Sequence, residues 1–155
     1  MLLRDYTPAD RAACLALFES STPDYFLPYE LAEFATFLDA LPGPYLVADD
    51  AGRVIGCGGY RVAGETAVLT WGMVARDRHR GGIGWQLLMA RLARIAGDPM
   101  VRIVRLDTSQ HSRGFFERAG FADTRVEPDG YGPGLHRHRM EFVLDSSRRE
   151  WLRGS

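Results

Sequence analysis

Residues 74–88 are the part of the sequence that most constrains the fold. The apolar segment that ends at Val74 is followed by a basic loop, by glycines at positions 81, 82 and 84, and by apolar residues at helical spacing. A helix that starts directly after glycines offers unpaired N–H groups and a partial positive charge to an anion. Glycines let a phosphate approach those N–H groups closely. The stretch therefore predicts a strand, a turn that can hold a pyrophosphate, and a helix, in that order.

The composition excludes several classes of protein. The chain has 155 residues, the size of one domain, and 46% of them are hydrophobic. Its net charge of −1 lacks the positive field that nucleic-acid-binding proteins usually show, so no nucleic-acid partner is predicted. All 19 residues counted as Lys or Arg are Arg. This excludes both a Schiff-base lysine and the lysine of a P-loop.

The cysteines and the hydropathy pattern predict where the protein works. Cys14 and Cys57 are not at metal-ligand spacing, so we predict buried free thiols, a reducing compartment and no metal site. Charges at Arg4 and Asp5 come too early for a signal peptide, and no apolar run is long enough to span a membrane. These features predict a cytoplasmic protein without a membrane partner.

The remaining patterns predict a single domain over residues 1–145 and a polar C-terminal tail over 146–155. The expected strands are 2–4, 45–49, 53–62, 66–74, 101–106, 121–126 and 136–144, and the expected helices are 7–19, 29–41, 82–96 and 111–118. Helix 82–96 connects two apolar strands that should be parallel, whereas the hairpins at either end should be antiparallel. Strand 66–74 is mostly apolar and is expected to be buried on both faces. The fold class is α/β, a mixed sheet with helices on both faces.

Two segments resemble the GNAT superfamily of N-acetyltransferases. Residues 79–84, His-Arg-Gly-Gly-Ile-Gly, resemble its motif A, in which Gln or Arg usually stands at the position of His79. Residues 115–121, Phe-Phe-Glu-Arg-Ala-Gly-Phe, resemble its motif B, and the order of strands and helices around both segments also matches. The resemblance implies a twisted, mostly antiparallel sheet of about seven strands with about four helices on its two faces.

The same resemblance implies that the chain uses acetyl-CoA as its acyl donor. The backbone amides of residues 79–85 would surround the pyrophosphate, and Arg80 would add positive charge. Gly72, inside an apolar strand, suggests a bulge; in the family such a bulge opens a space for the pantetheine arm. The implied cofactor-binding residues are Met73, Val74, His79, Arg80, Gly81, Gly82, Ile83, Gly84, Trp85 and Phe116.

The sequence leaves open which groups move the protons. The family usually has a tyrosine at the position of Phe116, whose ring has no proton to give to the leaving thiol. Three hydroxyl groups could act instead: Tyr131, Ser109 and Ser112. Alternatively a water could act, or the thiol could leave as a thiolate without an acid. Glu65 and Asp107 are the leading candidates for the base, and the further candidates are His111, His136 and His138. The catalytic residues predicted here are Glu65, Asp107 and Tyr131.

The predicted function is transfer of an acetyl group from acetyl-CoA to an amine of a small molecule or peptide, by direct attack in a ternary complex. The acceptor would bind at loops 23–28 and 129–134, which mix aromatic residues with Gly or Pro and an acid. The alternative is a non-catalytic acyl-CoA-binding or regulatory module, because Phe116 and the absence of a carboxylate from strand 66–74 both fit it. A nucleotide-binding α/β protein is a weaker alternative. The last strands offer an edge for a possible homodimer.

Overall fold

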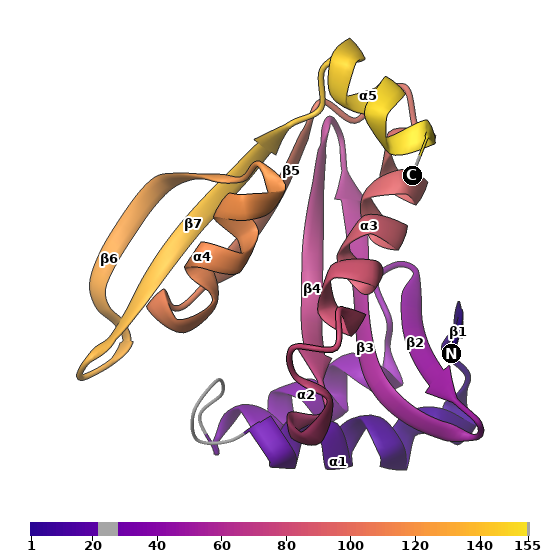
Figure 1. Ribbon diagram of the computed structural model, residues 1–155. Helices are drawn as coiled ribbons and strands as arrows, with labels where there is room; N and C mark the ends of the chain where they lie inside the picture. The colour runs from indigo at the N-terminus through magenta and orange to yellow at the C-terminus, as the bar shows by residue number, and fades with distance from the viewer. Residues whose placement is uncertain (22–27, 155) are drawn as a thin grey trace.

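The structure is a computed structural model that describes residues 1–21 and 28–154. Its centre is a seven-stranded sheet in the order β1-β2-β3-β4-β5-β7-β6 (Figure 1). The strands are β1 (Leu2–Asp5), β2 (Tyr45–Asp50), β3 (Arg53–Ala63), β4 (Thr66–Val74), β5 (Ile103–Thr108), β6 (Ala122–Gly132) and β7 (Leu135–Val143). The helices are α1 (Arg11–Ser21), α2 (Glu30–Asp39), α3 (Ile83–Ala96), α4 (Gln110–Ala119) and α5 (Ser146–Arg153), with short 3-10 turns η1 (Pro8–Asp10) and η2 (Arg76–Arg78).

The strand pairing confirms the predicted mixed sheet. β4 and β5 are parallel and are connected through α3, whereas every other neighbouring pair is antiparallel. Helices cover both faces of the sheet, and neighbouring residues of β3 contact helices on opposite faces. A Cβ added at Gly56 would touch Leu87 of α3, while the free thiol of the next residue, Cys57, faces the free thiol of Cys14 on α1.

The parallel strands β4 and β5 separate soon after they begin. Residues 66–68 pair with residues 103–105, and the rest of β4 has no partner in β5. Figure 1 shows β5, β7 and β6 turning away from β4, with α4 on their side and α3 beside β4 and β3. The core divides in the same way, into a cluster around β2, β3, α1 and α2 and a cluster around β5, β7, α4 and α5. α3 contributes residues to both clusters.

The separation of the strands corrects the prediction for strand 66–74. Only Ala67 and Met73 of β4 are buried, and most of its other residues are half-buried. A strand without a neighbour on one edge exposes that edge and the side chains along it, even when those side chains are apolar. The apolar pattern of β4 therefore does not mean that the strand is covered on both faces.

Two C-terminal segments also differ from the prediction. β6 extends to Gly132, so the predicted loop 129–134 forms the end of the β6–β7 hairpin. The sequence predicts a polar tail over residues 146–155, but residues 146–153 form α5. Asp145 caps this helix, since its carboxylate accepts from the N–H of Arg148 at 2.8 Å, and Leu152 is buried in the core. A mostly polar segment can therefore form a helix when one apolar side chain, here Leu152, packs into the core.

The described part of the chain gives two negative findings. None of its helices is long and apolar enough to cross a membrane. Within residues 1–21 and 28–154, no group of three or more His, Cys, Asp or Glu side chains could hold a metal ion.

Candidate active site

β4 carries a β-bulge at Trp71 and Gly72. Positions 57 and 59 of β3 pair with positions 73 and 70 of β4, so β4 has one residue more than β3 in this interval. Trp71 has a φ of +35°, outside the extended region. This is the bulge that Gly72 predicts from the sequence. It follows the point at which β5 has left β4, so its backbone lies along the opening between these strands.

Buried aromatic residues hold the bulge in place. The hydroxyl of Tyr45 donates to the carbonyl oxygen of Trp71 at 2.7 Å. Burial is the main cause that raises the pKa of Tyr45, so this hydroxyl keeps its proton. The indole of Trp71 packs on Phe34 of α2, with ring centroids 5.2 Å apart, and on Phe18 of α1, at 6.2 Å. The shape of the bulge is therefore determined by the core.

The backbone of Val74 points into the opening between β4 and β5. The N–H of Ala75 donates to Ile55 of β3 at 2.8 Å, so residue 75 faces β3. Because successive residues of a strand face opposite sides, the N–H and C=O of Val74 face away from β3. Its carbonyl oxygen lies 2.9 Å from Nε2 of His79, which must carry the proton. The backbone of Met73 faces β3 instead, and Met73 is buried. Of the two predicted cofactor-binding residues in β4, only Val74 therefore directs its backbone toward the opening.

The start of α3 offers a row of backbone N–H groups. Gly82 is the N-cap, with a φ of +78° and no side-chain cap bond. The first helical hydrogen bond runs from Gln86 to Gly82 at 3.0 Å, which leaves the N–H groups of residues 83–85 without a helical partner. A Cβ added at Gly82 would meet nothing within 4 Å, so the space in front of this helix end is open. Such a helix end fits a phosphate.

The loop before α3 is braced by ion pairs and backbone contacts. Asp77 makes two hydrogen bonds of 3.0 Å with Arg53 of β3, and these lower the pKa of Asp77. Arg78 pairs with Asp50 at 2.8 Å. Arg80 is exposed and has a φ of +72°, which places it in the left-handed region next to Gly81. The loop is thus built to hold one backbone shape, with the Arg80 side chain at the surface.

The next part of α3 faces inward. Ile83 is buried in the core, and a Cβ at Gly84 would lie 3.6 Å from Phe115 of α4 and from Val74. The indole of Trp85 packs edge-on against the ring of Phe115, with centroids 6.1 Å apart. Motif A and motif B are therefore in contact through these aromatic rings.

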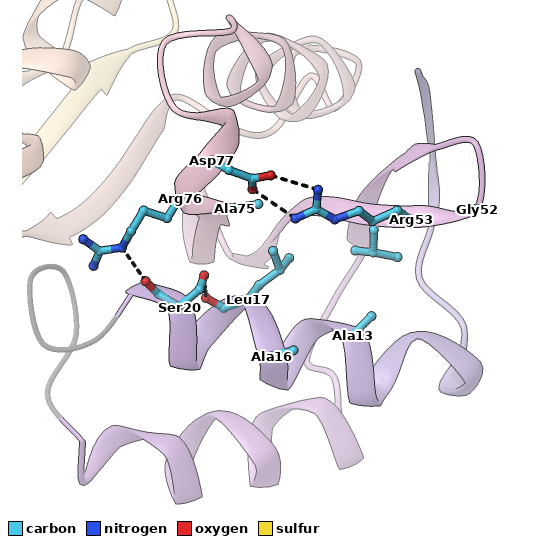
Figure 2. A pocket seen from close by; sticks show the side chains of 10 residues that line it. Ala13, Ala16, Leu17, Ser20, Gly52, Arg53, Ala75, Arg76 and Asp77 are labelled. Atoms are coloured by element: carbon cyan, nitrogen blue, oxygen red, sulfur yellow. Dashed lines mark hydrogen bonds and ion pairs between the residues drawn. The ribbon is translucent and has the colours of Figure 1, made fainter.

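A separate groove lies on the other side of the loop, between α1 and the β2–β3 turn. It has a volume of about 700 Å³ and an apolar floor of Ala13, Ala16, Leu17, Val54 and Ala75. Figure 2 shows the Arg53–Asp77 pair over one part of the groove, and Arg76 donating to the carbonyl oxygen of Ser20 at 2.8 Å. None of the predicted cofactor-binding or catalytic residues lines this groove.

Asp107 lies on the face of the sheet opposite α3 and α4, between two arginines of β7. Arg137 donates to its carboxylate through Nε at 3.1 Å, and Arg139 through Nε at 3.2 Å. Burial raises the pKa of Asp107, but the hydrogen bonds from the two arginines outweigh this effect and lower the pKa overall. A carboxylate held in this way is a weak base.

Tyr131 lies near the end of the β6–β7 hairpin, on the same face as Asp107. The guanidinium of Arg137 lies over its ring, 5.7 Å from the centroid. Burial, and then the negative charge of Asp107, raise the pKa of Tyr131 to about 12. Its hydroxyl therefore remains protonated at neutral pH and can donate a hydrogen bond. Asp107 and Tyr131 are the two predicted catalytic residues that the fold brings together.

Glu65 is at the wrong end of β4. It precedes Thr66, and its carboxylate lies 3.5 Å from Arg102, where β4 and β5 are still together. Gly72 of the bulge is seven positions further along the chain, and at about 3.3 Å per position this is roughly 23 Å. The prediction for Glu65 is therefore corrected: its carboxylate lies at the closed end of the two strands, far from the bulge.

Three of the other proton-transfer candidates, Ser109, His136 and His138, make structural hydrogen bonds. Phe116 is packed edge-on against Phe121, with centroids 5.7 Å apart. Ser109 caps α4, since its hydroxyl accepts from the N–H of His111 at 3.3 Å. His138 bonds to Asp123 at 3.1 Å, and Nδ1 of His136 accepts from the N–H of Asp129 at 3.1 Å. Acceptor loop 23–28 lies outside the described residues except for Pro28.

The sequence patterns missed two residues next to the bulge. Arg91 of α3 is only 5% exposed, and its guanidinium lies against Gly58 and Gly72. The sequence feature that could have identified Arg91 is its position inside the apolar stripe of the helix, three residues after Leu88. On the opposite face, the Oγ1 of Thr70 is buried without a hydrogen-bond partner among the described atoms. A buried hydroxyl without a partner is uncommon, and so is a buried arginine without a carboxylate, and both lie beside the bulge.

These features define a class of protein: an α/β domain whose sheet opens between two parallel strands, beside a helix end that can bind phosphate. The chain belongs to the acetyltransferase (GNAT) family, whose model matches residues 14–121, well over half of its length. No curated protein matches the sequence.

Solved structures of acetyltransferases share the fold. An acetyltransferase of the GNAT family from Desulfovibrio desulfuricans is 24% identical, with a TM-score of 0.76 over 93% of this chain and 99% of the other. A ribosomal-protein-alanine N-acetyltransferase from Brucella melitensis is 23% identical, with a TM-score of 0.73 over 92% and 99%. An aminoglycoside 6'-N-acetyltransferase in complex with coenzyme A is 16% identical, with a TM-score of 0.77 over 94% and 98%.

Proposed function

We propose that the protein transfers an acetyl group from acetyl-CoA to an amine by direct attack in a ternary complex. The observation that carries the proposal is the opening between β4 and β5, with a fixed bulge on one side and the uncapped start of α3 beside it. An acyl donor with a pyrophosphate and an extended arm has the right shape for these two features. When bound, it supplies an activated acyl carbon and a thiol leaving group.

The backbone performs most of the proposed binding. The N–H groups of residues 83–85 and the Arg80 guanidinium face the pyrophosphate. The N–H of Val74 donates to the acyl carbonyl oxygen, which gains negative charge during the attack. A donor fixed in this way contributes roughly 3–4 kcal/mol in acyl transfer reactions. Because Tyr45 and the core fix the bulge, this donor is oriented before any ligand binds.

The amine loses its proton to water in this proposal. Asp107 is paired with two arginines, so it orients the acceptor side of the site and does not accept the proton. Tyr131 keeps its proton at neutral pH and donates a hydrogen bond to the acceptor.

The charges of β5, β6 and β7 favour an acceptor that is not a polycation. Each of the three carboxylates on this face is already paired with an arginine: Asp107 with Arg137 and Arg139, Glu127 with Arg125, and Glu141 with Arg105. At the end of the β6–β7 hairpin, Asp129 is the one carboxylate of these strands without an arginine partner in the described part of the chain, so they provide a single unpaired carboxylate for a polyamine or an aminoglycoside. We infer that an amino acid or peptide amine is a better acceptor than the aminoglycosides that a structural neighbour acetylates.

A non-catalytic acyl-CoA-binding module is the second candidate. The observation that favours it is Phe116, whose ring is packed against Phe121 and provides no proton. Both candidates require acyl-CoA binding, so binding and release of the thiol must be measured separately. Binding without thiol release across a panel of peptides, amino acids, polyamines and aminoglycosides would favour the module.

The first test is the affinity for CoA of a variant that fills the helix end. Gly82→Asp places a carboxylate where the pyrophosphate would lie, and we expect the dissociation constant to rise at least 100-fold in titration calorimetry. Gly64→Asp is the matched control, because Gly64 also has a positive φ and open space around its Cβ position but lies at the β3–β4 turn. Its affinity should stay within about twofold of the wild type. Equal losses in both variants, or no binding by the wild type, would contradict the proposed site.

A further inference from the structure

Arg91 is a buried cation beside the bulge. It lies in the middle of α3, and only 5% of its surface is exposed. Its Nε donates to the carbonyl oxygen of Leu87 at 3.2 Å, and Nη1 donates to that of Gly59 at 3.4 Å. A fully buried charge costs several kcal/mol unless something compensates for it. A position in the apolar stripe of a helix would normally hold a residue such as leucine.

The sheet makes room for this side chain with glycines. A Cβ at Gly58 would lie 3.0 Å from Cζ of Arg91, and a Cβ at Gly72 would lie 3.3 Å from both Nη1 and Nη2. Gly72 is a residue of the bulge, and Gly58 is the residue of β3 opposite it. The guanidinium thus lies directly against the backbone that borders the opening between β4 and β5.

No carboxylate neutralises Arg91. No ion pair among the described residues, 1–21 and 28–154, includes Arg91. The two titratable groups that act on it most are Tyr45 and Cys57, and neither is a carboxylate. Burial lowers the pKa of Arg91 to about 10, so it remains a cation under ordinary conditions. By contrast Arg94, one turn further along the helix, pairs with Asp5 at 3.0 Å at the surface. The positive charge of Arg91 is therefore available to act on a negative charge that forms at the bulge.

From this geometry we propose that Arg91 stabilises the leaving thiolate of CoA, the task for which Phe116 lacks a hydroxyl group. The inference rests on the proposed function. The lone pair of the acceptor nitrogen forms the N–C bond, the C–S bond breaks, and its electron pair stays on sulfur. The proton of the nitrogen goes to water, and the thiolate departs without receiving a proton in the same step. A nearby arginine is a known way to favour a thiolate over a thiol.

The test is the titration of the CoA thiol in the complex with the protein, followed by thiolate absorbance. It requires no acceptor and no turnover. In the wild type we expect the bound thiol to titrate about one pH unit or more below free CoA. In Arg91→Met we expect this difference to disappear, and in Arg91→Lys, which keeps the charge, we expect most of it to remain. Arg94→Met, on the same helix, should titrate like the wild type.

Kinetics with any accepted amine provide a second measurement. Arg91→Met should lower kcat about 10- to 100-fold while the KM for acetyl-CoA changes less than threefold, because the charge acts on the leaving group. Phe116→Tyr supplies the missing hydroxyl, so it should raise kcat of the Arg91→Met variant at least fivefold, more than it raises kcat of the wild type.

The outcomes separate this inference from the proposed function. If the wild type does not bind CoA, the proposed function fails. If it binds CoA but the bound thiol titrates like free CoA, the role of Arg91 is overturned and the binding site stands. That result needs only the wild type, so it holds even if Arg91→Met does not fold. Equal thiol titration in the wild type and Arg91→Met would also overturn the role.

Discussion

At the scale of single residues, Phe116 and Arg91 show what a sequence pattern can and cannot reveal. The missing hydroxyl at position 116 is visible because a motif provides the expected residue. The burial of Arg91 is not visible, because an arginine on a helix is usually at the surface and its place here depends on glycines in two strands. Glu65 fails for a related reason: adjacency to a strand in the sequence does not tell which end of the strand is the site.

Asp10 leads to a prediction for the effect of pH on stability. It is 6% exposed, and Arg4 donates to it through Nη1 and Nη2 at 2.8 Å each. The hydrogen bonds from Arg4, then from the backbone of Thr7, lower its pKa although burial raises it. A carboxyl with a lower pKa in the folded state adds stability above its unfolded pKa of about 4, and loses it as the pH falls through the folded value.

We therefore expect Asp10→Asn to lower the free energy of unfolding by about 2 kcal/mol at pH 7 and to have less effect near pH 2. Urea unfolding at a series of pH values between these limits measures both changes. Asp39→Asn is the control, since Asp39 forms an exposed pair with Arg11 and should lose less than about 0.5 kcal/mol. An equal effect of Asp10→Asn at both pH values would show that its ionisation is not what stabilises the fold.

At the scale of elements, local patterns are enough where neighbouring residues determine the structure. α4 ends at Gly120 because this residue adopts a φ of +112°, and its start is fixed by Ser109. Both features can be read from the chain. The divergence of β4 from β5 cannot be read from the chain, because it depends on which of the two core clusters each strand packs against. The same holds for α5, whose polar sequence lacks the repeated apolar residues that identify a helix.

The packing of α3 against β3 predicts that Gly58 cannot be enlarged without cost. A methyl group there would lie 3.0 Å from Cζ of Arg91, so Gly58→Ala must push the guanidinium away from the bulge. We expect a loss of about 1–3 kcal/mol in the free energy of unfolding, measured by chemical denaturation. The bound CoA thiol should also titrate closer to free CoA.

Gly114→Ala is the matched control for this change. Gly114 lies inside α4, and its added Cβ would have only Arg118 Nη1 nearby, at 3.7 Å. Alanine in a helix should raise the free energy of unfolding by about 0.5–1 kcal/mol. If Gly58→Ala is as stable as Gly114→Ala, the guanidinium is not confined by the glycines.

At the scale of the whole molecule, the open end of the sheet depends on a closed end. The two halves meet where β4 pairs with β5, and α5 packs on α3 at that end (Figure 1). Arg149 of α5 donates to the carbonyl oxygens of Ala96 at 2.9 Å and Asp98 at 3.1 Å, and it also contacts that of Val101. This helix therefore ties the segment between α3 and β5 to the core of the second half.

Leu152 is the apolar anchor of this closed end, and it carries the last prediction. Its side chain is 1% exposed and belongs to the core cluster of β5, β7 and α4. We expect Leu152→Ala to cost about 2–5 kcal/mol in thermal or urea unfolding. CoA affinity should fall as well, because the angle between the halves sets the width of the opening. Arg153→Ala, at an exposed neighbouring position, should change stability by less than about 0.5 kcal/mol. A Leu152→Ala protein with unchanged stability and affinity would show that α5 is dispensable for both the fold and the site.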